Sequence, residues 1–84
     1  MVNIGDILIC NWKINSGTKG AEINEGEEVA VIQVNPKPEF NVKVISLHSG
    51  NESVGDAGYG NSHAHFRITG RKASKAVEIL YKKG

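Results

Sequence analysis

The sequence has little cysteine, proline and aromatic content, and each shortage narrows what the protein can be. The single cysteine, Cys10, cannot form an internal disulfide, so a fold held by disulfides is excluded and a reducing compartment is expected. Two prolines and 39% hydrophobic residues are typical of a globular chain rather than a disordered one. Aromatic residues make up 6% of the chain, which leaves little material for the stacking platform of a single-strand nucleic-acid binder.

Long apolar runs and an excess of one charge are missing as well. No apolar segment approaches the roughly 20 residues that span a bilayer, and nothing after Met1 has the pattern of a signal peptide. The formal net charge is +1, so no global field attracts nucleic acid or lipid. Eighty-four residues form one domain, 1–84, with little room for a deep substrate cleft. We therefore expect a cytoplasmic, single-domain protein with no membrane partner.

Turn-rich segments divide residues 4–69 into four β-rich stretches. Ile4–Trp12 is dominated by β-branched residues, which favour strands. Glu28–Val34 and Phe40–His48 flank a five-residue connection with two prolines, which predicts a hairpin. In the fourth stretch, His63–Thr69, alternation places three apolar residues on the core face: Ala64, Phe66 and Ile68. The opposite, outward stripe consists of His63, His65 and Arg67.

One glycine-rich stretch and one stretch that fits either a helix or a strand complete the predicted fold. Ser49–Ser62 contains four glycines and predicts a loop with Tyr59 near its tip, because glycine is unfavourable inside strands. Arg71–Lys83 has apolar residues on one side and basic residues on the other at helical spacing, which favours a short amphipathic helix with Thr69 as N-cap. Ala76–Tyr81 is also rich in β-branched and aromatic residues, so a fifth strand is the alternative.

The fold class that follows is mainly β, with four to five antiparallel strands in residues 3–69 and a helix or last strand in 70–83. Three segments resemble strands of a small Src-homology-3-like or KOW-type barrel: IGDILIC at 4–10, EGEEVAVI at 25–32 and HFRI at 65–68. The chain is also similar to small barrel proteins of bacteriophages and their hosts. The resemblance implies a small regulatory or host-modulating protein, and it names no ligand, since the aromatic cluster for proline-rich peptides and the KOW-type glycine are both absent.

Metal binding and catalysis are not favoured by any motif. His63 and His65 share a strand face, so both imidazoles could bind one metal ion. Zinc would need further ligands of the types available at His48, Cys10 and Asp56, and the spacing matches no zinc motif. We expect solvated histidines and neither a metal nor another cofactor.

Catalytic groups are not arranged as a constellation. Cys10 alternates in register with Leu8, which predicts a buried, inert thiol. The carboxylates around residues 25–28 flank a turn and are expected to be solvated, and the glycine run at 55–60 lacks the Lys-Ser/Thr of a phosphate-binding loop. We therefore expect that the protein is not an enzyme.

Charge is segregated along the chain. Residues 1–60 carry four basic and eight acidic side chains, whereas residues 61–84 carry six basic and one acidic. This pattern predicts a phosphate-contacting face for nucleic acid, made of Arg67, Arg71, Lys72, Lys75, Lys82 and Lys83. The alternatives are that a basic C-terminal helix packs near the acidic strand entries of its own fold, or that the basic face binds an acidic protein partner.

Docking on a protein partner is the favoured hypothesis, with nucleic acid as the second. The candidate surface consists of Tyr59 with the outward stripe His63, His65 and Arg67, and Trp12 is expected to close one end of the core. A near-zero net charge and few aromatic residues favour a protein over a nucleic acid. We expect a monomer, or a weak homodimer paired through an exposed strand edge.

Overall fold

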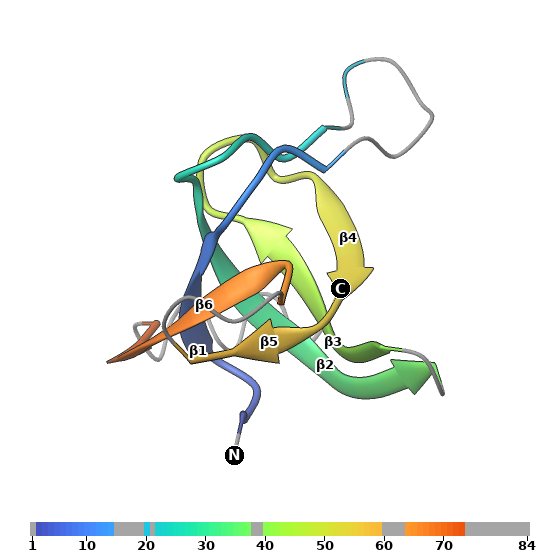
Figure 1. The fold of residues 1–84 in the computed structure, drawn as a ribbon, viewed down its shortest axis with the longest axis vertical. Helices are drawn as coiled ribbons and strands as arrows, with labels where there is room; N and C mark the ends of the chain where they lie inside the picture. Colours follow the sequence, from blue (N-terminus) through green and yellow to red (C-terminus); the bar gives the residue numbers. More distant parts are fainter. Residues whose placement is uncertain (1, 15–19, 21, 38–39, 60–63, 74–84) are drawn as a thin grey trace.

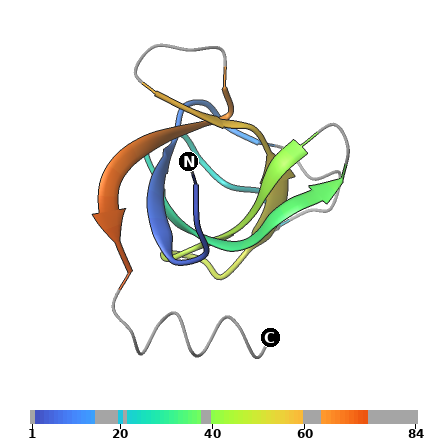
Figure 2. The ribbon, with the colours of Figure 1, turned by 90° about the horizontal axis from the view of Figure 1, so that it is seen from below.

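The computed structural model describes residues 2–14, 20, 22–37, 40–59 and 64–73, and all regular structure in this part is β (Figure 1). The strands are β1 (Asp6–Cys10), β2 (Glu28–Lys37), β3 (Phe40–Ser46), β4 (Glu52–Gly55), β5 (Ala57–Gly58) and β6 (Phe66–Lys72). They form one sheet of order β4-β3-β2-β1-β6-β5, which curls into a half-barrel (Figure 2). The predicted mainly β class is confirmed, but the prediction of four to five antiparallel strands is wrong: the described part has six strands, and β5 pairs with β6 in parallel. None of the described residues forms a helix that could cross a lipid bilayer.

The topology is a meander whose later strands return to its start. β1 to β4 pair successively as antiparallel neighbours, and β6 pairs antiparallel with β1. β5 is parallel to β6. β4 and β5 are successive in the chain and separated by Asp56 alone, yet they lie at opposite ends of the strand order. The segment Glu52–Gly58 therefore links the two edges of the curled sheet.

The core follows from alternation along the strands, because successive side chains point to opposite faces. The fully buried cluster consists of Leu8, Cys10, Ile23, Val29, Val31, Val42, Val44 and Phe66. Ile23 comes from the connection between β1 and β2 and is held by a backbone bridge to Ile14. Ile68 packs against the cluster from β6, so the predicted core positions of Phe66 and Ile68 are confirmed, whereas Ala64, the third predicted core residue, precedes β6 and is half-buried. Each fully buried aliphatic or aromatic side chain contributes about 1.5–3 kcal/mol through removal from water.

The predicted β2–β3 hairpin is confirmed, but the predicted end of its first strand at Val34 is wrong. β2 continues to Lys37, and the register shifts between Val34 and Lys37. Asn35 lies at this irregularity with a backbone φ of 54°. A bulge of this kind accommodates a proline within a strand, which is why Pro36 does not end β2.

The loop predicted for Ser49–Ser62 is also wrong, because β4 and β5 lie within it. Gly55 is buried and ends β4. A Cβ atom added to Gly55 would lie 2.9 Å from Cε2 of Phe66. The glycine therefore permits close packing between segments, and it does not mark a loop.

The predicted strand His63–Thr69 occurs three residues later at both ends, as Phe66–Lys72. Thr69 is a strand residue rather than a helix N-cap, since its hydroxyl donates to the carbonyl of Ile7 at 2.7 Å. Gly70, with φ of 80°, follows at the register shift in the β1–β6 pairing, which lets the strand continue. Arg71 and Lys72, the start of the predicted helix, are consequently in β6. Residues 74–84 lie outside the described part.

Candidate functional site

A groove of about 520 Å³ lies between the N-terminal segment, the β2–β3 hairpin and strands β5 and β6. Its apolar and aromatic lining consists of Val2, Val34, Ala57, Gly58, Tyr59 and Ile68. Three carboxamide side chains complete it: Asn3, Asn35 and Asn41. None of these described lining residues carries a charge, although 23% of the whole chain is charged. The lining formed by the described residues is thus an uncharged concave surface with hydrogen-bonding groups.

Tyr59 is the most exposed large apolar side chain of the groove. It is 68% exposed, and Val34 in the opposite hairpin is 37% exposed. The other two exposed large hydrophobic residues in the described part, Trp12 and Leu47, do not line this groove. The structure therefore places Tyr59, predicted to bind a partner, in the same groove as the partly exposed Val34.

Asn41 holds β5 in place with its side chain. The N–H of Ala57 donates to Asn41 Oδ1 at 2.9 Å, and Asn41 Nδ2 donates to the carbonyl of Ala57 at 3.5 Å. The adjacent residues Val42 in β3 and Gly55 in β4 form the last backbone pair between these two strands. The carboxamide thus continues the β3–β4 ladder by binding the backbone of one residue on both its donor and acceptor sides.

The other side of the β4–β5 segment is bonded to β6. The N–H of Phe66 donates to the carbonyl of Asp56 at 3.0 Å, and the N–H of Asp56 donates to His65 Nδ1 at 3.1 Å. Asn41 and His65 therefore fix the segment from opposite directions. Tyr59 directly follows this anchored segment.

His65 is a structural residue as well as a member of the predicted outward stripe. Its ring is half-buried, with its centroid 5.7 Å from that of Trp12. Trp12 is 41% exposed and covers His65, so the expectation that it closes one end of the core is wrong. Arg67 is exposed, and His63 lies outside the described residues. The stripe is accordingly split between a supporting imidazole and an exposed guanidinium.

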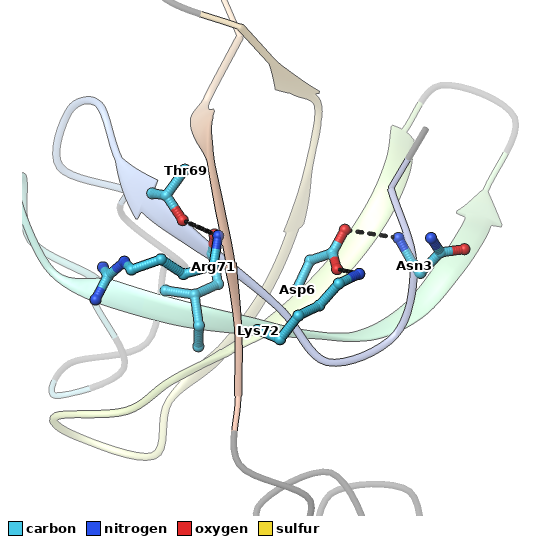
Figure 3. A network of polar contacts seen from close by, with 6 residues as sticks. Asn3, Asp6, Thr69, Arg71 and Lys72 are labelled. Atoms are coloured by element: carbon cyan, nitrogen blue, oxygen red, sulfur yellow. Dashed lines mark hydrogen bonds and ion pairs between the residues drawn. The ribbon is translucent and has the colours of Figure 1, made fainter.

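Two of the predicted nucleic-acid contacts are paired within the fold. Arg71 forms an ion pair with Glu28 at the start of β2. Lys72 forms one with Asp6 at the start of β1, and Asp6 also accepts a hydrogen bond from the N–H of Asn3 at 2.9 Å (Figure 3). Arg71 and Lys72 thus lie near acidic strand starts of their own fold, as the alternative expected, but they do so from strand β6 and not from a helix. Lys75, Lys82 and Lys83 lie outside the described residues.

The two partners in the Asp6–Lys72 pair should differ in their effect on stability. The Asp6 side chain is 10% exposed and that of Lys72 is 61% exposed. Lys72→Ala is expected to lower the free energy of unfolding by less than about 1 kcal/mol, because exposed charges are well solvated. Asp6→Ala is expected to cost about 1–3 kcal/mol, since it leaves the N–H of Asn3 without its acceptor. Urea denaturation of both variants measures this asymmetry, and equal losses would contradict it.

A second, acidic notch lies at the start of β2, lined by Asn24, Glu25, Gly26, Glu27, Glu28, Leu47 and His48. The expectation that Glu27 is solvated is wrong. Ser46 Oγ donates to its Oε1 at 2.5 Å, and the N–H of Asn24 donates to its Oε2 at 2.6 Å. Burial acts to raise the pKa of Glu27, but these hydrogen bonds and the neighbouring His48 lower it below its ordinary value. In the described part of the chain, no three His, Cys, Asp or Glu side chains are grouped as metal ligands.

Cys10 is buried as predicted. It is 1% exposed, and its Sγ donates to the carbonyl of Trp12 at 2.9 Å. Burial raises the pKa of the thiol, and the negative charges of Glu27 and Glu25 raise it further. A protonated, enclosed thiol is a poor nucleophile, in line with a structural role.

Comparison of the chain with protein-family models, curated proteins and solved structures gives no match. The sequence had indicated Tyr59, but it gave no sign of the three asparagines that share its groove. Asn35-Pro36 appeared only as a turn signal. Asn41 lies in β3 and Asn3 precedes β1, and the pairing of distant strands, which no local motif encodes, brings both to the other lining residues.

Proposed function

We propose that this protein is a non-enzymatic docking module, a small Src-homology-3-like barrel that binds and regulates a protein partner. The fold part of the proposal is supported by the antiparallel order β4-β3-β2-β1-β6, a meander whose last strand returns beside the first. The observation that carries the binding part is the 68% exposure of Tyr59 at a groove whose described lining residues carry no charge. Exposed tyrosines in concave, partly apolar surfaces are frequent anchors of protein interfaces.

Charge favours a protein over a nucleic acid as the ligand. Phosphate binding depends on available Lys and Arg side chains. Arg71 and Lys72 are paired with carboxylates of their own fold, and no cation lies among the described residues of the groove. Tyr59 is also the single ionisable side chain among those lining residues. They therefore offer no nucleophile with an adjacent base for catalysis.

Loss of the Tyr59 ring is expected to weaken partner binding by about 30-fold or more, the effect of removing a central interface anchor. An aromatic photo-crosslinking amino acid at position 59, which retains a benzene ring there, would capture the partner from native extract, and titration of the purified partner would then compare wild type with Tyr59→Ala. The stability of Tyr59→Ala should stay within about 0.5 kcal/mol of wild type, because the side chain is exposed.

Leu47→Ala is the matched control, since Leu47 is 39% exposed and lies away from the groove. It should leave affinity unchanged. Partner binding that survives Tyr59→Ala would overturn the proposal.

The nucleic-acid alternative is favoured by one observation, the exposed Arg67 near the start of β6, two residues after His65, whose ring contacts that of Trp12. Binding of labelled duplex and single-stranded DNA and RNA is measured at 50 and 200 mM salt. We expect no micromolar binding at either concentration. Binding that collapses at the higher salt and is lost in the Arg71→Glu/Lys75→Glu double variant would replace the docking proposal with the nucleic-acid one.

A further inference from the structure

We propose that the groove binds an uncharged, extended segment of the protein partner, and that the Asn35 carboxamide pairs with the backbone of that segment. This inference rests on the proposed docking function and adds the chemistry of the ligand. It follows from three features of the groove: an internal example of the same recognition, an unengaged carboxamide, and the absence of charge from the described lining.

The internal example is the contact between Asn41 and Ala57. One carboxamide there binds both the N–H and the carbonyl of a single residue in an extended strand. A carboxamide has donors and an acceptor side by side, which matches a peptide unit. Phosphate and carboxylate groups present acceptors alone, so they cannot use both sides of the carboxamide. One carboxamide of the groove lining thus already pairs with the backbone of an extended segment of this chain, β5, which forms part of the groove wall.

Asn35 offers a second carboxamide to a ligand. It is exposed at the β2 irregularity, with φ of 54°, a left-handed conformation that asparagine tolerates better than most residues. Its side chain makes no hydrogen bond with the described residues, whereas that of Asn41 makes two. Val34 precedes it and Tyr59 lines the same groove, so apolar contact and backbone pairing are available to one ligand.

The uncharged lining defines the ligand further. A charged side chain placed in this groove would lose water without gaining an opposite charge from the described lining residues. Tyr59 is the one aromatic residue among them, so the parallel aromatic walls that grip proline-rich helices are not formed by this part of the chain. An extended segment with uncharged, apolar side chains is therefore the occupant that fits. A nucleobase also pairs with a carboxamide, but its phosphates would lack cations here.

Two substitutions at Asn35 test the inference on the full-length protein. Asn35→Gly removes the carboxamide and keeps the left-handed backbone accessible, while Asn35→Asp keeps the size and replaces the donor with a negative charge. Peptides selected from a random 12-residue display library, together with segments of the cross-linked partner, provide the probes. We expect the best peptides to be uncharged across their central residues, and both variants to bind them about tenfold more weakly. Amide NMR signals of Asn35, Ala57 and Tyr59 should shift on binding.

The outcomes separate this inference from the docking function. If Tyr59→Ala weakens partner binding while Asn35→Gly does not, docking stands and backbone pairing by Asn35 is wrong. Selection of strongly charged peptides, binding only of the folded partner and none of its segments, or equal shifts with a short adenine oligonucleotide would each overturn the uncharged-peptide inference. If position 59 contacts no protein, the docking function itself fails. Denaturation curves of Asn35→Gly and Asn35→Asp show whether either variant is still folded, and a loss of affinity counts only for a folded one.

Discussion

Replacing Gly55 with alanine is expected to lower the free energy of unfolding by about 2–3 kcal/mol, the upper range for overpacking a well-packed core. The added Cβ would lie 2.9 Å from Phe66 Cε2, 3.0 Å from His65 Nδ1 and 3.1 Å from His65 Cβ. Gly55→Val should cost more, because it places two further methyl groups in the same space. Urea denaturation followed by tryptophan fluorescence measures both losses, with Trp12 as the single reporter.

The neighbours of Gly55 have little freedom to move away. Phe66 is fully buried in the core cluster, and His65 is held by the N–H of Asp56 and by its contact with Trp12. The cost is steric rather than conformational, since Gly55 has no positive φ whereas Gly50 does. A shift of β4 would also disturb Asp56 and therefore the anchoring of the segment that precedes Tyr59.

Two controls test the steric explanation for Gly55. Gly50→Ala has nothing within 4 Å of its added Cβ and a φ of 80°, so its loss should be about 1 kcal/mol and arise from the backbone alone. Phe66→Leu should destabilise on its own but reduce the cost of Gly55→Ala, giving a favourable coupling energy in the double variant. Equal losses at Gly50 and Gly55, or strict additivity with Phe66→Leu, would contradict close packing at Gly55.

The same glycine shows why part of the fold could not be predicted. Alternation was enough to place Phe66 and Ile68 inside, because strand periodicity is a local property of the sequence. The role of Gly55 depends on the side chain of Phe66, which packs closely against it, whereas composition alone suggested a loop. The continuation of β6 beyond Thr69 could not be predicted for a similar reason, because it depends on pairing with a distant strand. Gly70 at the register shift keeps Lys72 paired with Asp6, whereas the helical spacing of residues beyond Arg71 indicated a different structure.

Part of the candidate site could likewise be predicted from the sequence, and part of it could not. An aromatic residue surrounded by glycines was sufficient to indicate that Tyr59 is exposed, and the structure places it on a groove. The asparagines at 3, 35 and 41 belong to segments that only the strand register brings together. Charge segregation was visible in the sequence, but the partners of Arg71 and Lys72 depend on which strand starts lie beside β6. The chemical character of each side chain could be read from the local sequence. Which charges are neutralised by a partner, and which side chains gather into one site, could not.

Ser46→Ala is expected to lower the free energy of unfolding by about 2 kcal/mol at pH 7, with a smaller loss in acid. Ser46 is 1% exposed, and its hydroxyl donates to Glu27 Oε1 while accepting from the N–H groups of His48 and Ser49, each at 3.1 Å. Alanine removes all three bonds at the turn between β3 and β4. The bond to Glu27 is the one that depends on pH, because it favours the ionised carboxylate.

The sign of the pH dependence follows from the lowered pKa of Glu27. Burial opposes ionisation of this carboxylate, but the hydrogen bonds from Ser46 and Asn24 outweigh it. A carboxyl group with a lower pKa in the folded than in the unfolded state stabilises the fold above its unfolded pKa of about 4.3, and that stability is lost as the pH falls through the folded value. Removal of Ser46 should raise the pKa of Glu27. The difference in stability between wild type and Ser46→Ala should therefore be largest near neutral pH and shrink below about pH 4.

Glu27→Gln is the matched control for this pH dependence. The glutamine amide oxygen can still accept from Ser46, but it does not titrate, so Ser46→Ala in that background should cost a similar amount at pH 7 and pH 3. Unfolding of the four proteins in urea at both pH values completes the cycle. A wild-type difference that stays constant between pH 7 and pH 3 would assign the role of Ser46 to the His48 and Ser49 amides alone. A difference that shrinks only when Glu27 is present would place the coupling between the start of β2 and the β3–β4 turn in this one charge-assisted hydrogen bond.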